Sequence, residues 1–299
     1  MNFLRYSFTL VATISSVFVS CNKDEDIVID NPSSPDTSLG YEVLEYTPAP
    51  GQYINEINSV FDGVNTPEEA CDQAKNRLSQ GLYVSLGAWG GYIVVKFDES
   101  INNSGDYDFA ISSNSFDTSN EPGIVWVMQD VNGNGLPDDT WYELKGSDFG
   151  EPGYERNYWV TYTRPGEDEN TPWIDSNGET GVVKWMGNYH NQSFYYPNWV
   201  KEDSYTLYGS RLPSKARQNE LTGIWENPPF EWGYADNFGS DFFKDGGKNM
   251  FRISNAVTEE NTPANLSSID FVKVQTAING STNLLGENST EVCGFFRLN

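Results

Sequence analysis

The chain has 299 residues, with 18 Lys and Arg against 43 Asp and Glu, so its formal net charge is −25. Nucleic-acid binding and adhesion to anionic lipid both need clustered basic side chains, and this charge balance argues against both. The 17 Phe, 17 Tyr and 9 Trp supply enough apolar area for a core, which excludes a disordered acidic chain.

The first twenty residues have the pattern of an export signal. Arg5 precedes an apolar run over residues 8–19 that is too short to span a bilayer, and Cys21 follows at once. The stretch FVSC at 18–21 resembles a lipobox, so we expect residues 1–20 to be a lipoprotein signal peptide and Cys21 to carry the lipid. An ordinary secretory peptide with an incidental Cys21 is the alternative.

Residues 21–40 predict a flexible acidic tether. The cluster NKDED at 22–26 is followed by a stretch rich in Asp, Ser and Pro without hydrophobic periodicity. An acidic cluster directly after the lipidated Cys resembles the surface-export signal of lipoproteins from Gram-negative gut anaerobes. We therefore expect the chain on the outer face of the outer membrane, held there only by its lipid anchor, with residues 41–299 folded as a single domain.

One helix is clearly indicated. Thr66, Pro67 and Glu69 have the spacing of a capping box with Pro at the first helical position, and the apolar face of this helix continues to about residue 78. The rest of the chain reads as short strands between Gly, Asn, Asp and Pro clusters. The expected strands cover 82–86, 92–97, 107–111, 124–129, 141–144, 157–163, 182–186, 221–225, 250–253, 269–275 and 291–298.

Strand number and spacing predict an all-β fold. We expect an antiparallel β-sandwich or jelly roll with one short helix, decorated at one end by long loops from about 165 to 247. In the strand over 269–275, Phe271 and Lys273 should lie on the face opposite Val272 and Val274. A β-propeller would need a blade repeat of roughly 40–50 residues, which the sequence lacks.

A loop beginning at Asp130 has the spacing of a calcium site. Oxygen-bearing side chains stand at positions one, three, five and nine, and Gly135 stands at position six. Position twelve is Trp141, so the usual bidentate acid must come from elsewhere. The expected ligands, with Leu136 acting through its carbonyl, are Asp130, Asn132, Asn134, Leu136, Asp138, Asp139 and Glu143. The role would be structural, and a metal-free turn rich in Asx residues is the alternative.

Aromatic residues are dense in the second half of the chain, where seven of the nine Trp lie between 141 and 232. Most are expected to fill the core, but those in loops among Gly, Pro, Asn and Asp are harder to bury. Exposed rings with polar neighbours bind flat or polyhydroxylated ligands. The candidate ligand-binding residues are Trp173, Tyr189, Tyr195, Tyr196, Trp199, Trp232 and Tyr234.

Neither catalysis nor transition-metal binding is indicated. His190 is the sole His and no Gly-x-Ser-x-Gly elbow is present, which leaves little for a Ser–His triad. The two remaining cysteines, Cys71 and Cys293, form a disulfide or stay as thiols, and the sequence leaves both open. Carboxylate pairs for glycoside cleavage cannot be chosen among 43 acids. We expect a non-enzyme, with a glycoside hydrolase as the minor alternative.

Four longer runs resemble a known family. They are YVSLGAWGGY at 83–92, EPGIVWV at 121–127, NGNGLPDDTWYEL at 132–144 and IDFVKVQT at 269–276. These runs are similar to cell-surface lipoproteins of Gram-negative gut anaerobes, over nearly all of 41–299. The resemblance implies an accessory to a TonB-dependent outer-membrane transporter that captures a corrinoid such as vitamin B12. A calcium-containing protein that binds or cleaves glycans at the surface is the second hypothesis, because fold alone does not separate the two.

Overall fold

The computed structural model describes residues 40–56, 61, 63–244, 246–282 and 286–298. The predicted signal peptide, the lipidation site Cys21 and the tether as far as residue 39 lie outside these residues. Within them, no helix is long and apolar enough to cross a membrane.

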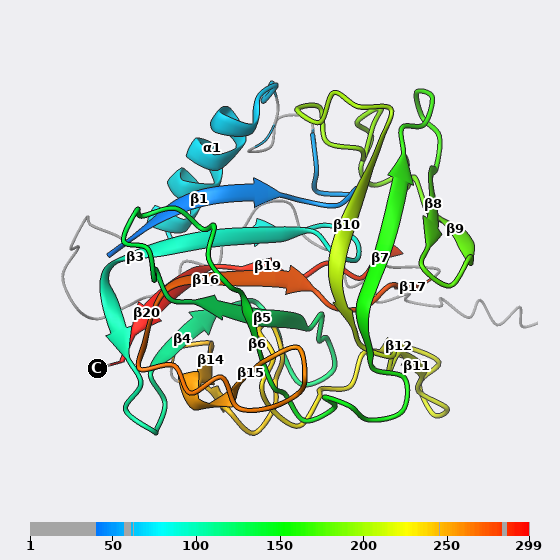
Figure 1. Cartoon of the computed structure of the whole chain (residues 1–299). Coiled ribbons are helices and arrows are strands. Elements are labelled where there is room, and N and C mark those ends of the chain that lie inside the picture. The colour runs from blue at the N-terminus through cyan, green and yellow to red at the C-terminus, as the bar shows by residue number, and fades with distance from the viewer. Residues whose placement is uncertain (1–39, 57–60, 62, 245, 283–285, 299) are drawn as a thin grey trace, which may run out of the picture.

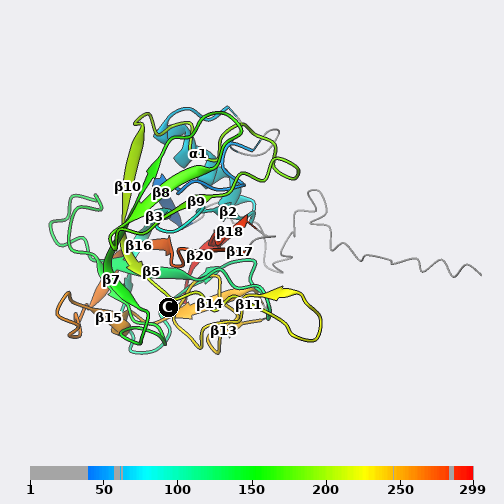
Figure 2. The ribbon, with the colours of Figure 1, turned by 90° about the vertical axis from the view of Figure 1, so that its right-hand side faces the viewer.

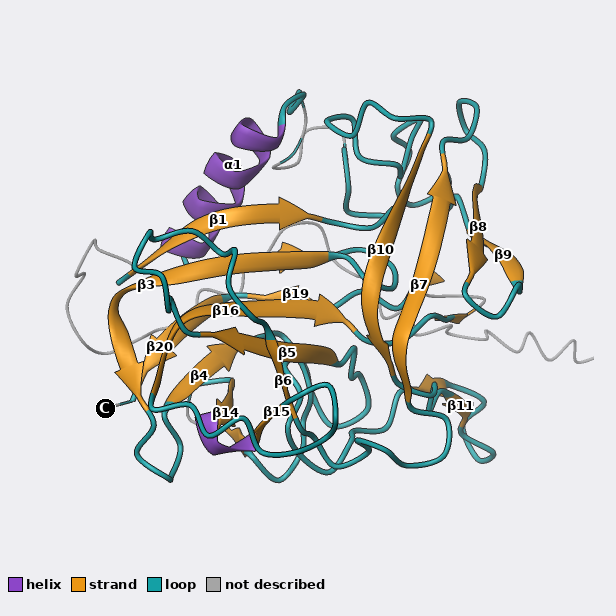
Figure 3. Cartoon of the chain, in the orientation of Figure 1, coloured by secondary structure: helices purple, strands orange, loops and turns teal. Residues whose placement is uncertain are grey.

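The fold is an antiparallel β-sandwich with one α-helix, as predicted (Figure 3). Its largest sheet has six strands in the order β1-β3-β16-β5-β6-β15. In that order the strands are β1 (Tyr41–Thr47), β3 (Tyr92–Asn102), β16 (Ser268–Thr276), β5 (Gly123–Met128), β6 (Tyr142–Leu144) and β15 (Ala256–Val257).

One face of the six-stranded sheet is covered by a smaller sheet and the helix. The smaller sheet runs β13 (Phe242–Phe243), β14 (Lys248–Phe251), β4 (Phe109–Ser112) and β20 (Gly294–Arg297). The short pair β2 (Val84–Ser85) and β19 (Glu291–Val292) lies with it, and α1 (Pro67–Ser79) packs on β1 (Figure 1). The main core lies between these layers and contains Val95, Ile111, Phe251, Val272 and Val274.

The third sheet runs at a steep angle to the first at one end of the molecule (Figures 1 and 2). Its order is β10 (Ser204–Arg211), β7 (Glu155–Thr163), β8 (Thr171–Asp175) and β9 (Thr180–Val183). A second core of aromatic side chains lies behind it, around Trp89, Tyr158 and Tyr162. The small elements are β11 (Arg217–Gln218), β12 (Trp225–Glu226), η1 (Ile253–Asn255), β17 (Ser281–Thr282) and β18 (Gly286–Glu287).

Features that depend on residues close together in the sequence formed as predicted. The Thr66 hydroxyl accepts a hydrogen bond from the Glu69 N–H, and the Glu69 carboxylate accepts one from the Thr66 N–H, so the predicted capping box is present. Val272 and Val274 are buried in the main core, opposite Lys273, as the alternation in this strand predicted. Cys71 and Cys293 are free thiols rather than a disulfide.

Two expectations about the middle of the chain were wrong. Residues 165–247 are not mainly decoration, because β8, β9 and β10 complete a sheet with β7. The expected strand over 221–225 is mostly a turn: residues 221–224 join β11 to β12, and only Trp225 belongs to a strand. In this turn the Asn219 side chain accepts the N–H groups of Leu221 and Thr222. An Asn that bonds its own following backbone favours such a turn over a strand ladder.

Candidate functional site

The predicted calcium loop is closed by its own side chains. The two oxygens of Asp130 accept the N–H groups of Asn134 at 3.1 Å and Gly135 at 2.9 Å, and Asp139 Oδ2 accepts the Val131 N–H at 2.8 Å. The Asn134 and Asn132 amides donate to Asp138 and lower the pKa of that carboxyl. These hydrogen bonds give the carboxylates and the backbone N–H groups of the turn their partners without a metal ion. Calcium binding by this loop therefore stays a prediction.

Glu143 is not part of this loop, and its assignment as a ligand is corrected. It lies in β6 with only 2 % of its surface exposed, and it accepts hydrogen bonds from the hydroxyls of Tyr154 at 2.8 Å and Ser210 at 2.6 Å. Arg156 Nε approaches it at 4.0 Å. Burial raises the pKa of Glu143 in spite of these partners. The strand points this carboxylate into a hydrogen-bond network that joins β6 to β10.

Four of the seven predicted ligand-binding aromatics are buried, which corrects their assignment to an exposed platform. They are Tyr195, Tyr196, Trp199 and Tyr234, each with 4 % or less of its surface exposed. Tyr196 packs edge-on against Tyr205 at 5.1 Å, and its hydroxyl donates to the Glu202 carbonyl. In a chain with few aliphatic residues, loop aromatics fill the cores.

The other three predicted aromatics do not form one surface. Tyr189 is 77 % exposed, whereas Trp173 and Trp232 are partly buried. Trp173 packs on the aromatic core behind the third sheet. Trp232 belongs to a different part of the molecule, where its carbonyl accepts the Ser147 N–H.

Sequence reasoning missed a group of rings on the six-stranded sheet. Trp126, Trp141 and Tyr92 have ring centroids 4.8, 5.3 and 5.7 Å from Lys273 Nζ, and all four side chains are partly buried. We call these four residues the aromatic–lysine face. Burial lowers the pKa of Lys273 to about 8, although Glu45 and Glu143 oppose this shift. The predicted alternation of β16 put Lys273 opposite the core, but it gave no sign of the cross-strand rings.

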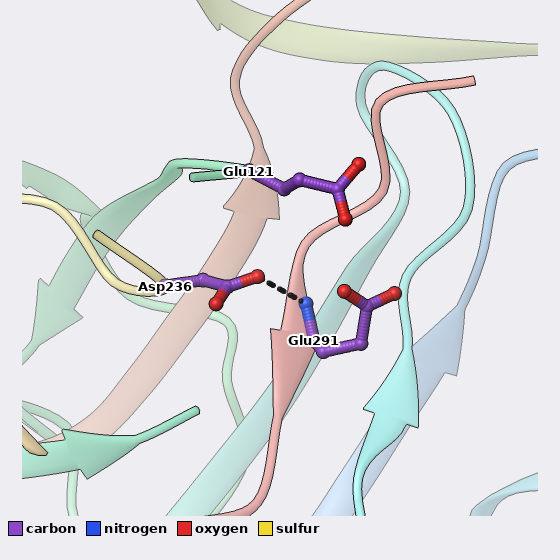
Figure 4. A group of neighbouring side chains, drawn as sticks. All are labelled: Glu121, Asp236 and Glu291. Carbon is purple, nitrogen blue, oxygen red and sulfur yellow. Dashed lines mark hydrogen bonds between the residues drawn. The ribbon is translucent and has the colours of Figure 1, made fainter. Parts of the chain in front are cut away.

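A second unpredicted cluster is formed by three acids, Glu121, Asp236 and Glu291. One carboxylate oxygen from each lies within 4.8 Å of the others. Asp236 Oδ2 accepts the backbone N–H of Glu291 at 2.9 Å, and the Glu121 carboxylate lies beside the two (Figure 4). Burial raises the pKa of Glu121 to about 7, and burial followed by mutual repulsion raises the pKa values of Asp236 and Glu291 well above their usual range.

The sole His pairs with an acid that is distant in the sequence. Nδ1 of His190 lies 2.7 Å from Glu56 Oε1, and its ring packs edge-on against Tyr53 at 4.9 Å. This arrangement anchors the loop that carries Tyr189.

Two candidate centres thus stand out among the described residues. The aromatic–lysine face suits an aromatic or anionic ligand, and the cluster of three acids suits a cation.

Comparison with known proteins does not narrow these possibilities. No family model matches the chain, and no curated protein sequence matches it.

Proposed function

We propose that this protein is a surface-exposed lipoprotein, anchored to the outer membrane by a lipid on Cys21, that captures a nutrient ligand. A corrinoid such as vitamin B12 is the first candidate ligand, and a TonB-dependent outer-membrane transporter is the expected recipient. The export pattern of residues 1–40 and the likeness of four sequence runs to such lipoproteins support the proposal. Capture and delivery need no catalysis.

The single observation that carries ligand capture is the aromatic–lysine face. One ring comes from β3, one from β5 and one from Trp141, the residue directly before β6. All three surround the amine of Lys273. Such rings stack on a flat macrocycle, and an ammonium group pairs with a phosphate. A corrinoid has a flat ring system and a phosphodiester, so its chemistry matches both features. The indole N–H of Trp126 is also buried without an acceptor among the described residues.

The predicted calcium loop lies next to this face. Lys96 Nζ donates to the Gly135 carbonyl at 3.4 Å, and the chain leads directly from Asp139 to Trp141. A calcium ion in the loop would therefore restrict Trp141 and order the ligand-binding face before the ligand arrives. We expect calcium to strengthen ligand binding without contacting the ligand.

The test is a calorimetric titration of the full chain, purified in detergent, with cyanocobalamin in calcium and again in chelator. We expect binding in calcium and at least tenfold weaker binding for Trp126→Ala and Trp141→Ala, because each removes one stacking ring. Tyr189→Ala is the matched control: it removes an exposed aromatic from a different loop and should leave the dissociation constant unchanged.

No binding of cyanocobalamin in either condition would overturn corrinoid capture. The alternative is a calcium-containing surface protein that binds or cleaves carbohydrate, since Trp rings also stack on sugars. The same wild-type and Trp141→Ala proteins would then be titrated with neutral oligosaccharides and assayed for their hydrolysis. Oligosaccharide binding that depends on Trp141 would establish the carbohydrate alternative.

A further inference from the structure

Three segments far apart in sequence meet at the acidic cluster. The N–H of Glu121 donates to the carbonyl of Asp236 at 3.2 Å, and Gly123 and Ala235 exchange backbone hydrogen bonds at 2.9 Å. On the other side, the Ser289 N–H donates to Glu121 Oε1 at 3.1 Å. The backbone therefore holds the start of β5, the loop that carries Asp236 and the start of β19 against one another.

Two of the three carboxylates at this meeting point each have an oxygen that accepts no hydrogen bond from the described residues. Asp236 is 1 % exposed and Glu291 is 4 % exposed, while Glu121 is partly exposed. Asp236 Oδ1 and Glu291 Oε1 are buried and have no hydrogen-bond partner among the described residues. An unpaired buried carboxylate oxygen is costly, so its persistence calls for a bound group.

Among the described residues, no basic side chain forms an ion pair with the cluster. Across the described part of the chain, none of the eight close pairs of acidic and basic side chains involves Glu121, Asp236 or Glu291. Three carboxylates this close repel one another strongly in a poorly hydrated interior. Either bound protons or a bound metal ion must offset this repulsion.

We propose that Glu121, Asp236 and Glu291 bind a divalent metal ion, with Ca²⁺ as the first candidate. Calcium takes oxygen ligands at about 2.3–2.6 Å, so one ion joins oxygens that lie up to roughly 5 Å apart. The 4.8 Å limit for the three carboxylate oxygens fits that span. A purely oxygen ligand set selects hard cations, among which Mg²⁺ and Mn²⁺ are the competitors.

Two further oxygens without hydrogen-bond partners lie in the stretch of chain that leads to Glu291. Residues 287–291 form a run of five buried polar residues in which Glu287 Oε2 and Asn288 Oδ1 also have no hydrogen-bond partner among the described residues. Glu287 interacts electrostatically with Glu121 and helps to raise its pKa. A cation here would fasten the C-terminal strands to β5 and to the loop carrying Asp236, which is a structural role independent of the ligand proposed above.

The test measures cation binding to the full chain, purified in detergent and stripped with chelator. Calcium is titrated by calorimetry at pH 7.5 into wild type, Glu291→Gln and Glu121→Gln, with Mg²⁺ and Mn²⁺ in separate runs. We expect each variant to lose one bound ion per chain or to bind it at least tenfold more weakly. Glu121→Gln is included because its partly exposed site tolerates substitution if Glu291→Gln does not fold, as judged by circular dichroism.

Two controls separate this site from other acids. Asp241→Asn changes a buried acid outside the cluster and should keep the wild-type stoichiometry. Asp138→Asn weakens only the surface loop and should leave the cluster ion bound. The proposal is overturned if wild type binds none of the three cations, if Glu121→Gln binds like wild type, or if Asp138→Asn alone abolishes all binding. Each of these results means that the cluster holds protons.

Discussion

The Asp130–Asp139 loop and the Glu121–Asp236–Glu291 cluster are both rich in carboxylate oxygens, yet they differ in how those oxygens are used. In the surface loop, Asp130 and Asp139 accept backbone N–H groups, and Asp138 accepts amide N–H groups from two Asn side chains. In the buried cluster, one oxygen each of Asp236 and Glu291 has no partner among the described residues. The carboxylates of the loop thus accept hydrogen bonds from the loop itself, whereas the cluster leaves two buried carboxylate oxygens without such donors.

A spacing of ligand residues in the sequence and unpaired carboxylates in the structure are therefore separate properties. Close spacing allows the loop to satisfy itself through local turns, since Asn and Asp readily bond the following backbone. The cluster residues come from positions 121, 236 and 291, so no local backbone can rearrange to serve them all. If this contrast governs cation binding and stability, substitutions in the cluster and in the loop should have very different effects.

The largest expected effect is the stabilisation of wild type by calcium. An ion present at about 1,000 times its dissociation constant stabilises the folded state by about 4.1 kcal/mol. For a domain of this size, that corresponds to a rise in the melting temperature of about 8–16 °C. Thermal unfolding followed by circular dichroism, in calcium and in chelator, measures the rise. An equal rise in Glu291→Gln would contradict the contrast, because the surface loop would then supply the stabilisation.

Features that depend on residues close together in the sequence could be predicted, whereas features that join distant segments could not. The helix α1 was predictable because Thr66, Pro67 and Glu69 act within one turn, and the two faces of β16 follow from alternation. The cluster and the aromatic–lysine face were not predictable, because both depend on cross-strand pairing. Lys273 meets Trp126 only through the register of β16 on β5.

The buried loop aromatics show a second limit. Tyr195 and Tyr196 stand among polar residues, which favoured exposure, yet each is buried and donates its hydroxyl to a backbone carbonyl. A Tyr ring can fill a core and still satisfy its polar end, so local composition does not decide its burial. Only the packing of the third sheet against these loops determines it.

An intermediate effect is expected at Asp241, a buried acid that lies outside the cluster. Burial raises its pKa to about 6 even though it accepts the Gly233 N–H at 2.6 Å. The folded state therefore binds the proton more tightly than the unfolded state does, and the resulting stability is full below about pH 4 and is lost as the pH rises through 6.

Asp241→Asn should accordingly match wild type near pH 4 and exceed it by about 2–3 kcal/mol at pH 7.5. Urea unfolding at the two pH values measures this difference in the free energy of unfolding. The gain should be the same in calcium and in chelator, since a lone buried acid needs no ion. A gain that appears only in chelator would place Asp241 in the cation site and weaken the distinction between burial and clustering.

The smallest effect is expected for Asp130→Ala in the surface loop. The substitution removes the acceptors for the Asn134 and Gly135 N–H groups, but the first bond is exposed and the second only partly buried, so water replaces the lost partner. In chelator, we expect a loss of about 1 kcal/mol in the free energy of unfolding, measured with urea. A loss above about 3 kcal/mol would mean that the loop is coupled to the core, through Lys96 on the Gly135 carbonyl or through Trp141. The surface loop and the buried cluster would then form one cooperative unit rather than two independent sites.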